Sequence, residues 1–161
     1  MIVPDLRGYG DSDKPADGYA KRTMAADVVA VAKALGHERF ALAGHDRGAL
    51  VAIRAGLDHT KTITHLASLD VLPTLESWDV LHGVNAAVGY HLFLMAQPPG
   101  LPEAMIGAVP DAFFGSFLDA WAQNPDAIPA DVRAEYLRAS RDAVSHVLAD
   151  FRGVTDAMAG S

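Results

Sequence analysis

The residues best suited to chemistry are an aspartate and the two glycines that flank it, in the pattern Gly44-x-Asp46-x-Gly48. A short apolar run, Phe40 to Ala43, precedes the pattern, and an apolar helical pattern from Ala49 to Leu57 follows it. Strand, tight turn and helix in this order are the context of a nucleophile elbow, normally written G-x-S-x-G. We therefore predict that Asp46 is a catalytic nucleophile, against the alternative that it only caps the helix amino terminus.

An aspartate at this position limits the types of reaction that the site can catalyse. A carboxylate that attacked an ester carbonyl would form a mixed anhydride, which gains little over the starting ester. A carboxylate that attacks a saturated carbon bearing a halide or an epoxide oxygen forms a stable alkyl ester, which an activated water can then hydrolyse. Asp46 therefore predicts displacement at carbon rather than esterase or protease activity.

The elbow also carries a family resemblance. The run Gly44-His45-Asp46-Arg47-Gly48-Ala49, with Asp58-His59 ending the next helix, resembles the haloacetate dehalogenase branch of the α/β-hydrolases. Epoxide hydrolases and haloalkane dehalogenases, which usually carry Trp at the position of Arg47, are close relatives in this pattern. The resemblance runs along nearly the whole chain and implies an α/β fold, with a parallel sheet core and a helical cap.

Arg47 has two predicted roles. Its backbone N–H is placed to help form an oxyanion hole, as the residue after an elbow nucleophile does. Its guanidinium can also bind a substrate carboxylate in a bidentate manner. In the family this carboxylate is held by this arginine and a second one three residues on. That second position is Leu50 here. Together with Leu92, which stands where the family has Trp, it makes a more apolar halide or an epoxide a serious competitor to haloacetate.

The resemblance also implies a site for the leaving halide. His91 matches a cap histidine that the family uses for halide binding, and Tyr136 matches a tyrosine from a later cap helix. The tryptophan that follows the histidine in the family is Leu92 here. An imidazole N–H and a phenol O–H in a dry pocket would stabilise the departing halide. The alternative is that both side chains only pack between helices.

The elements that position these residues alternate along the first 74 residues. Met1 to Pro4 resembles the end of a strand, and a helix with Thr23 as its N-cap is expected to end at Gly36. Ile63 to Asp70 reads as the strand after the elbow helix, which favours a parallel, doubly wound sheet. Asp70 closes that strand at its carboxyl end, and the resemblance makes it the acid that orients the catalytic histidine. The alternative is an aspartate that only starts a turn.

The chain divides by sequence texture into three parts. We predict a partial α/β-hydrolase core with the nucleophile elbow in residues 1–74. Residues 75–152 carry amphipathic helical patterns interrupted by prolines, and we predict that they form the cap. Residues 153–161 are predicted to be a tail.

Composition restricts the partners. The net charge of −7 argues against nucleic acid binding, which needs clustered Lys and Arg. There is no cysteine and no metal-ligand spacing of histidines, so we expect no metal and no cofactor. No apolar run is long enough to cross a membrane, and no signal peptide is recognisable, so we expect a cytoplasmic protein. Its partner should be a small-molecule substrate, and a homodimer is allowed.

The function predicted from the sequence is an Asp-nucleophile hydrolase that displaces halide from a small haloacid or haloalkane. An epoxide hydrolase is the first alternative, and a truncated, non-catalytic fragment of such an enzyme is the second. The family needs a catalytic histidine after the last strand, and none of the seven histidines follows a strand beyond the cap. We therefore expect residues 1–161 alone not to turn over, because a general base contributes about 10²–10⁴-fold.

Overall fold

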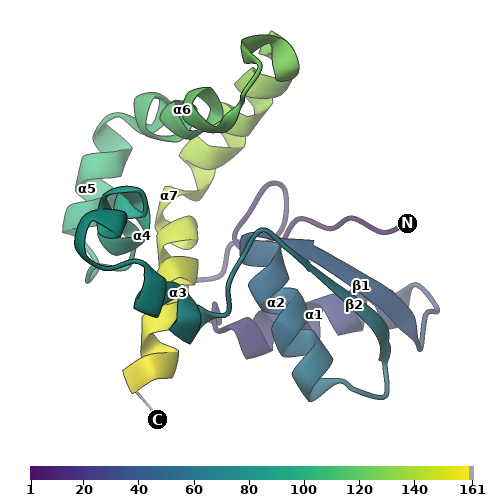
Figure 1. Cartoon of the computed structure of the whole chain (residues 1–161). Coiled ribbons are helices and arrows are strands. Elements are labelled where there is room, and N and C mark those ends of the chain that lie inside the picture. The colour runs from purple at the N-terminus through teal and green to yellow at the C-terminus, as the bar shows by residue number, and fades with distance from the viewer. Residues whose placement is uncertain (160–161) are drawn as a thin grey trace.

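The chain folds into a small α/β unit followed by a region of helices (Figure 1). The computed structural model describes residues 1–159, except for the side chains of Thr74, Leu75, Trp78, Pro125 and residues 153–159. The first unit consists of α1 (Lys21–Ala34), β1 (Phe40–His45), α2 (Arg47–Asp58) and β2 (Ile63–Leu69). The helical region consists of α3 (Thr74–Val80), the 3₁₀-helix η1 (Gly83–Ala87), α4 (Tyr90–Met95), α5 (Leu101–Ala108), α6 (Pro110–Trp121), the 3₁₀-helix η2 (Pro125–Ala127) and α7 (Ala130–Ala159).

The two strands pair in parallel, as the alternation of strands and helices predicts. Phe40 pairs with Ile63, and His45 pairs with Leu69, so both strands end at the same edge of the sheet. Helix α2 packs on both strands, and α1 packs on α2. This arrangement brings the residues after β1 and β2 close together, at the edge where parallel sheets hold their sites.

The first helix begins earlier than its capping pattern predicts. We expected Thr23 as the N-cap, whereas α1 begins at Lys21, with Ala20 at the N-cap and no capping side chain. The predicted end of the helix is correct, since Gly36 follows it with a φ of 84°. Met1 to Pro4, expected to end a strand, is in no strand of the described structure.

Two apolar clusters stabilise the described chain, and one tyrosine contacts both. The first lies between α1 and α2 and contains Met24, Ala25, Val51 and Ala55. The second joins α7 to α4 and α5 and contains Met95, Ile106, Ala143, Val147, Leu148 and Phe151. Tyr9, in the loop before α1, packs against both clusters. The loop before α1 is therefore part of the contact between the α/β unit and the helical region.

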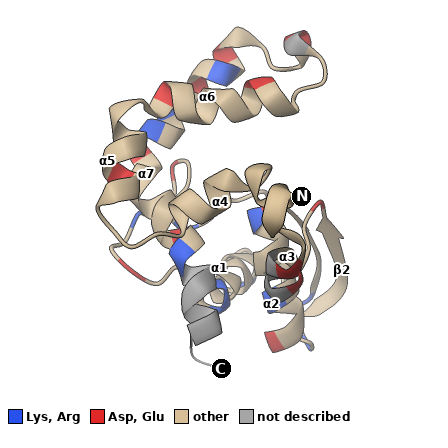
Figure 2. Cartoon of the chain, turned by 60° about the vertical axis from the view of Figure 1, so that its left-hand side comes forward, with Lys and Arg blue, Asp and Glu red and all other residues tan. Residues whose placement is uncertain are grey.

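Helix α7 connects the outer helices to the α/β unit. At 30 residues it is about 45 Å long, and it contacts α4, α5 and α6 in turn (Figure 1). Acidic and basic residues are interspersed along α7, whereas α5 and α6 carry acidic residues and no basic ones (Figure 2). Residues 75–152 are helical or irregular in the structure, as the sequence pattern predicts, and α7 continues beyond residue 152 to Ala159.

Candidate active site

Asp46 lies in a strained turn between β1 and α2. Its φ of 49° and ψ of −119° are far from the regions that L-residues prefer. The backbone N–H of Asp46 donates to the carbonyl of Leu69 at 3.1 Å, which ties the turn to the end of β2. Its side chain is exposed. The turn therefore presents a carboxylate at the sheet edge, in the manner that a nucleophile elbow requires.

Gly44 is required by the close approach of strand and helix. A Cβ atom built on Gly44 would lie 2.3 Å from the carbonyl oxygen of Gly48, which is far inside van der Waals contact. A Cβ atom built on Gly48 would meet nothing within 4 Å. The steric need for glycine at the elbow therefore rests on Gly44, while Gly48 supplies the backbone that Gly44 approaches.

Asp70 lies beside the elbow, directly after β2. It has a φ of 54°, and its Oδ2 atom is 3.4 Å from Nε2 of His45, the residue before Asp46. Both side chains are largely exposed. The structure thus brings Asp70 to the same edge as Asp46. The contact with His45 was not predicted from the sequence, although His45 ends β1, Asp70 directly follows β2, and both strands end at the same edge of the sheet.

His91 lies on α4 in an aromatic environment. Its ring centroid is 4.9 Å from that of Phe117 and 5.5 Å from that of Trp121, both on α6, and 5.7 Å from that of Tyr90. Its Nδ1 atom is buried and has no hydrogen-bond partner among the described groups. The aromatic side chains of α4 and α6 therefore surround an imidazole whose Nδ1 atom can still form a hydrogen bond with a ligand.

Burial lowers the pKa of His91, and the charge of Asp46 partly opposes this by raising it. The lowered pKa makes the neutral imidazole the main form at neutral pH, with one N–H to donate. The carboxylate of Asp46 is therefore near enough to influence the pKa of His91.

The guanidinium of Arg47 is bound to an acid that the sequence analysis did not single out. Its Nε donates to Oδ2 of Asp150 on α7 at 2.9 Å, and its Nη2 donates to the backbone carbonyl of Asp150 at 2.9 Å. The side chain of Asp150 is fully buried, and it also accepts hydrogen bonds from Tyr9 and Lys21. Asp150 interrupts the apolar helical stripe of Ala143, Val147 and Phe151, and that interruption is the sequence signal that could have found it.

Burial alone would raise the pKa of Asp150, but Arg47 and Lys21 together lower it. The carboxylate is therefore charged at neutral pH. Burial and the nearby charge of Arg47 lower the pKa of Lys21 to about 8, although Asp150 opposes this shift. The cluster of Tyr9, Lys21, Arg47 and Asp150, called here the Asp150 cluster, thus contains two cations around a single carboxylate.

Tyr136 is an exposed residue of α7, with a relative exposure of 54%. No ring contact between Tyr136 and His91 is present among the described side chains. Leu50 is half-buried on α2, and Leu92 packs against the apolar cluster around α7.

Within the described residues there is no group of three or more His, Cys, Asp or Glu arranged to hold a metal ion. Over the same part of the chain, no helix is both long and apolar enough to cross a membrane.

Comparison with known proteins agrees with this geometry. Residues 1–136 match the model of the alpha/beta hydrolase fold family. The chain is 37% identical to a fluoroacetate dehalogenase from Burkholderia sp. over 148 residues, which are 88% of this chain and 49% of that protein. It is 34% identical to a soluble epoxide hydrolase from Corynebacterium sp. (strain C12) over 141 residues, 86% of this chain and 49% of that protein.

A solved structure from Pseudomonas aeruginosa, described as that of a candidate epoxide hydrolase, superposes with a TM-score of 0.88 at 40% identity. The match covers 97% of this chain and 55% of that one. The chain spans about half the length of the curated relatives that it matches. With the family model matching most of its residues, and with a strained elbow between parallel strand and helix, the chain belongs to the α/β-hydrolase fold family.

Proposed function

We propose that the protein displaces halide from a small haloacid or haloalkane, with Asp46 as the nucleophile. The observation that carries this proposal is the backbone of Asp46, which holds an exposed carboxylate in a strained strand–helix turn. In the first step an Oδ atom of Asp46 attacks the carbon that bears the halogen. The carbon–halogen bond breaks, the halide leaves with the electron pair, and an alkyl ester of Asp46 forms.

The surrounding residues supply the remaining roles in this proposal. The neutral imidazole of His91 donates an N–H to the leaving halide from its aromatic surroundings, with Tyr136 as the second proposed donor. In the second step water adds to the carbonyl carbon of the ester, and the backbone N–H of Arg47 stabilises the oxyanion. The intermediate then collapses, the bond from this carbon to the alkyl oxygen breaks, and the alcohol product leaves with Asp46 restored. Asp70 orients the general base that accepts the proton from this water.

The second candidate function is epoxide hydrolysis by the same nucleophile. It is favoured by Leu50 and Leu92, two apolar residues at positions where the haloacetate pattern has Arg and Trp. It is also favoured by the similarity to a soluble epoxide hydrolase. In this reaction the carbon–oxygen bond of the epoxide breaks in place of the carbon–halogen bond. The oxygen keeps the electron pair, stays on the neighbouring carbon and takes a proton from water, so a hydroxyalkyl ester of Asp46 forms.

The experiment is a single turnover in heavy-oxygen water with the protein expressed in its complete reading frame. Chloroacetate, a neutral chloroalkane and an aryl epoxide are compared as substrates. Covalent catalysis predicts that the label enters the Asp46 carboxylate, detected by mass spectrometry of the peptide that contains it. Label found only in the product would contradict it. Asp46→Asn is the matched control, since it keeps the side-chain shape and removes the nucleophile.

A second variant tests the class of substrate. Leu50→Arg places a second guanidinium one helical turn after Arg47, so we expect KM for chloroacetate to fall relative to KM for a neutral chloroalkane. One added charged hydrogen bond corresponds to a factor of about ten in this ratio. An unchanged ratio would mean that Leu50 does not border the carboxylate-binding part of the site.

A further inference from the structure

The Asp150 cluster gathers donors from three separate segments on one buried carboxylate. Tyr9 comes from the loop before α1, Lys21 from the start of α1, and Arg47 from the start of α2. The hydroxyl of Tyr9 donates to Oδ2 of Asp150 at 2.7 Å, and the ammonium of Lys21 pairs with Oδ1. Replacing such a charge by an apolar residue is often neutral or stabilising in other proteins, so burial of an ion pair by itself does not explain its presence.

The contacts of Arg47 suggest what the buried charge does. Two bonds to Asp150 hold the Nε and Nη2 side of the guanidinium. Its central carbon lies 4.0 Å from the centre of the Phe151 ring, so the group also has an aromatic ring against its face. Two hydrogen bonds fix the direction of the guanidinium within its plane, and the stacking contact fixes the tilt of that plane. The group is therefore held in one orientation before any ligand binds.

Asp150 accepts hydrogen bonds from only some of the N–H groups of Arg47. A guanidinium has five N–H donors, and these two bonds take one from Nε and one from Nη2. The three that remain are on Nη1 and Nη2. The hydroxyl of Tyr9 is close enough to interact with this guanidinium, and two further donors are enough to bind both oxygens of another carboxylate. A donor group that is already oriented loses less conformational entropy on binding.

We propose that Asp150 is a positioning residue, which holds the Arg47 guanidinium so that its remaining donors bind a carboxylate group of the substrate. This inference rests on the proposed function of the site around Asp46, since Arg47 is the next residue in the chain. By this inference Asp150, on α7, helps Arg47 to select substrates that carry a negative charge. The arrangement should strengthen the binding of a halide that carries a carboxylate, but not the binding of an uncharged halide.

Lys21 provides a matched control. It pairs with the same carboxylate and is buried to a similar degree, with a side-chain exposure of 12% against 14% for Arg47. However, it lies at the start of α1, 26 positions before Arg47 in the chain, and has no bond to Arg47. Lys21→Met therefore disturbs the Asp150 cluster as a structural element while leaving both bonds between Asp150 and Arg47 in place.

The test compares chloroacetate with chloroacetamide, which share a carbon skeleton and differ in charge. The protein is expressed in its complete reading frame as the unchanged form, Asp150→Asn and Lys21→Met. We expect Asp150→Asn to lower kcat/KM for chloroacetate about tenfold relative to chloroacetamide, mainly through KM, the factor of one charged hydrogen bond. We expect Lys21→Met to keep the ratio within about twofold, because it removes no bond to Arg47.

Two outcomes would overturn the inference. An equal loss for both substrates in Asp150→Asn would mean that the residue is only structural. A shift of the ratio toward chloroacetate would mean that Asp150 withholds Arg47 from the substrate. If Asp150→Asn does not fold, Phe151→Leu removes the stacked ring alone. It should lower the ratio by about threefold, and an unchanged ratio would count against orientation of Arg47.

Failure of the proposed function is recognised separately. If the unchanged protein turns over neither halide, the proposed reaction is wrong, and the inference is then tested by calorimetric binding of glycolate and glycolamide. We expect glycolate to bind the unchanged protein and to bind Asp150→Asn about ten times more weakly, with no matching change for glycolamide. Absence of glycolate binding to the unchanged protein would overturn the inference.

Discussion

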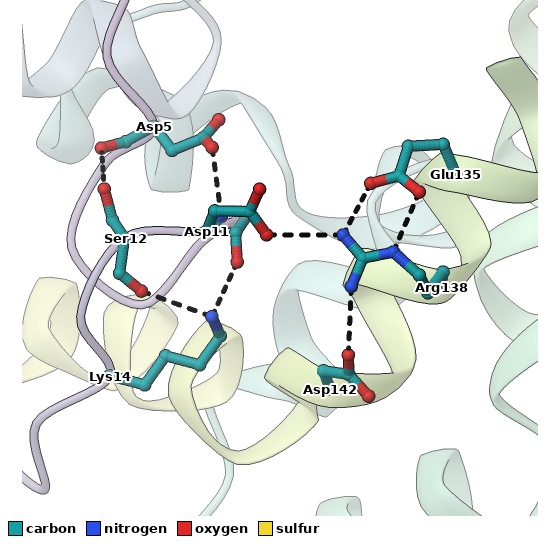
Figure 3. A network of polar contacts seen from close by, with 8 residues as sticks. Asp5, Asp11, Ser12, Lys14, Glu135, Arg138 and Asp142 are labelled. Carbon is teal, nitrogen blue, oxygen red and sulfur yellow. Dashed lines mark hydrogen bonds and ion pairs between the residues drawn. The ribbon is translucent and has the colours of Figure 1, made fainter.

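Helix α7 meets the N-terminal loop through two ion networks that differ mainly in burial. Near its C-terminal end, Asp150 is buried and binds Tyr9, Lys21 and Arg47. About three turns earlier, Arg138 is exposed and binds Glu135, Asp142 and, at 3.3 Å, Asp11 of the loop (Figure 3). On the loop side, the backbone N–H of Asp11 is held by Asp5, and Lys14 donates to the carbonyl of Ser12.

The number of contacts does not decide which of the two networks contributes more to stability. Arg138 has three acidic partners, as many as Asp150 has donors. Water and salt screen the exposed charges, and long exposed side chains lose entropy when they pair. Asp150 is fully buried, so removal of one of its partners leaves a buried charge or donor unsatisfied. We therefore expect stability to depend on the buried network.

The largest effect is expected for Asp150→Ala. Removing the carboxylate leaves Lys21 and Arg47 buried without their counter-charge, which should lower the free energy of unfolding by about 3–5 kcal/mol. Urea unfolding followed by circular dichroism measures it. Asp142→Ala on the same helix removes an exposed acid and serves as the control. Similar losses for the two variants would contradict the contrast between the networks.

A smaller effect is expected for Tyr9→Phe. The ring remains between the two apolar clusters, and only the hydroxyl that donates to Asp150 at 2.7 Å is lost. Because the acceptor is charged, the free energy of unfolding should fall by about 1.5–3 kcal/mol. The same urea titration applies. A value near zero would indicate that Lys21 and Arg47 already satisfy the carboxylate.

The next largest effect is expected for the pH dependence of stability, through the titration of Lys21. Lys21 has a pKa of about 8 in the folded protein, below its ordinary value of 10.5, so the unfolded chain holds more protons between these values. The free energy of unfolding should therefore rise between pH 8 and pH 10, by about 1–2 kcal/mol, as the folded state is no longer penalised for a buried charge. Lys21→Met should remove this rise. A fall over the same range in the unchanged protein would contradict it.

The smallest effect is expected for Arg138→Ala. Its three ion pairs are exposed to solvent, so the melting temperature should change by less than about 2 °C. The change that remains should vanish in 0.5 M sodium chloride, where exposed charges are screened. A loss as large as that of Tyr9→Phe would show that the network of Figure 3 anchors α7 to the loop.

The elbow could be predicted from the sequence because its signals are local. The apolar run, the two glycines and the following helical pattern all lie within about twenty residues, and the structure has β1, the turn at Asp46 and α2 there. The parallel pairing of β1 and β2 follows from the same alternation of elements. The family model that matches residues 1–136 confirms the fold class.

The Asp150 cluster could not be predicted in this way, because its partners lie 103 to 141 positions apart in the chain. The start of α1 was misplaced for the same reason. Thr23 is the better N-cap by local propensity, but Lys21 is held by Asp150 at the first turn, and this tertiary contact accompanies a helix that begins three residues earlier. No local pattern around Arg47 indicates that its guanidinium binds an acid of the protein itself.

The sequence separation within the Asp150 cluster has a consequence for biosynthesis. A ribosome adds about 5–20 residues per second, so Asp150 is made roughly 6–26 seconds after Lys21, from which it is 129 positions away. During that interval Tyr9, Lys21 and Arg47 have been translated, and the carboxylate that joins them has not. The nascent α/β unit must therefore keep these groups in water, and the desolvation of this part of the molecule is a late event that waits for α7.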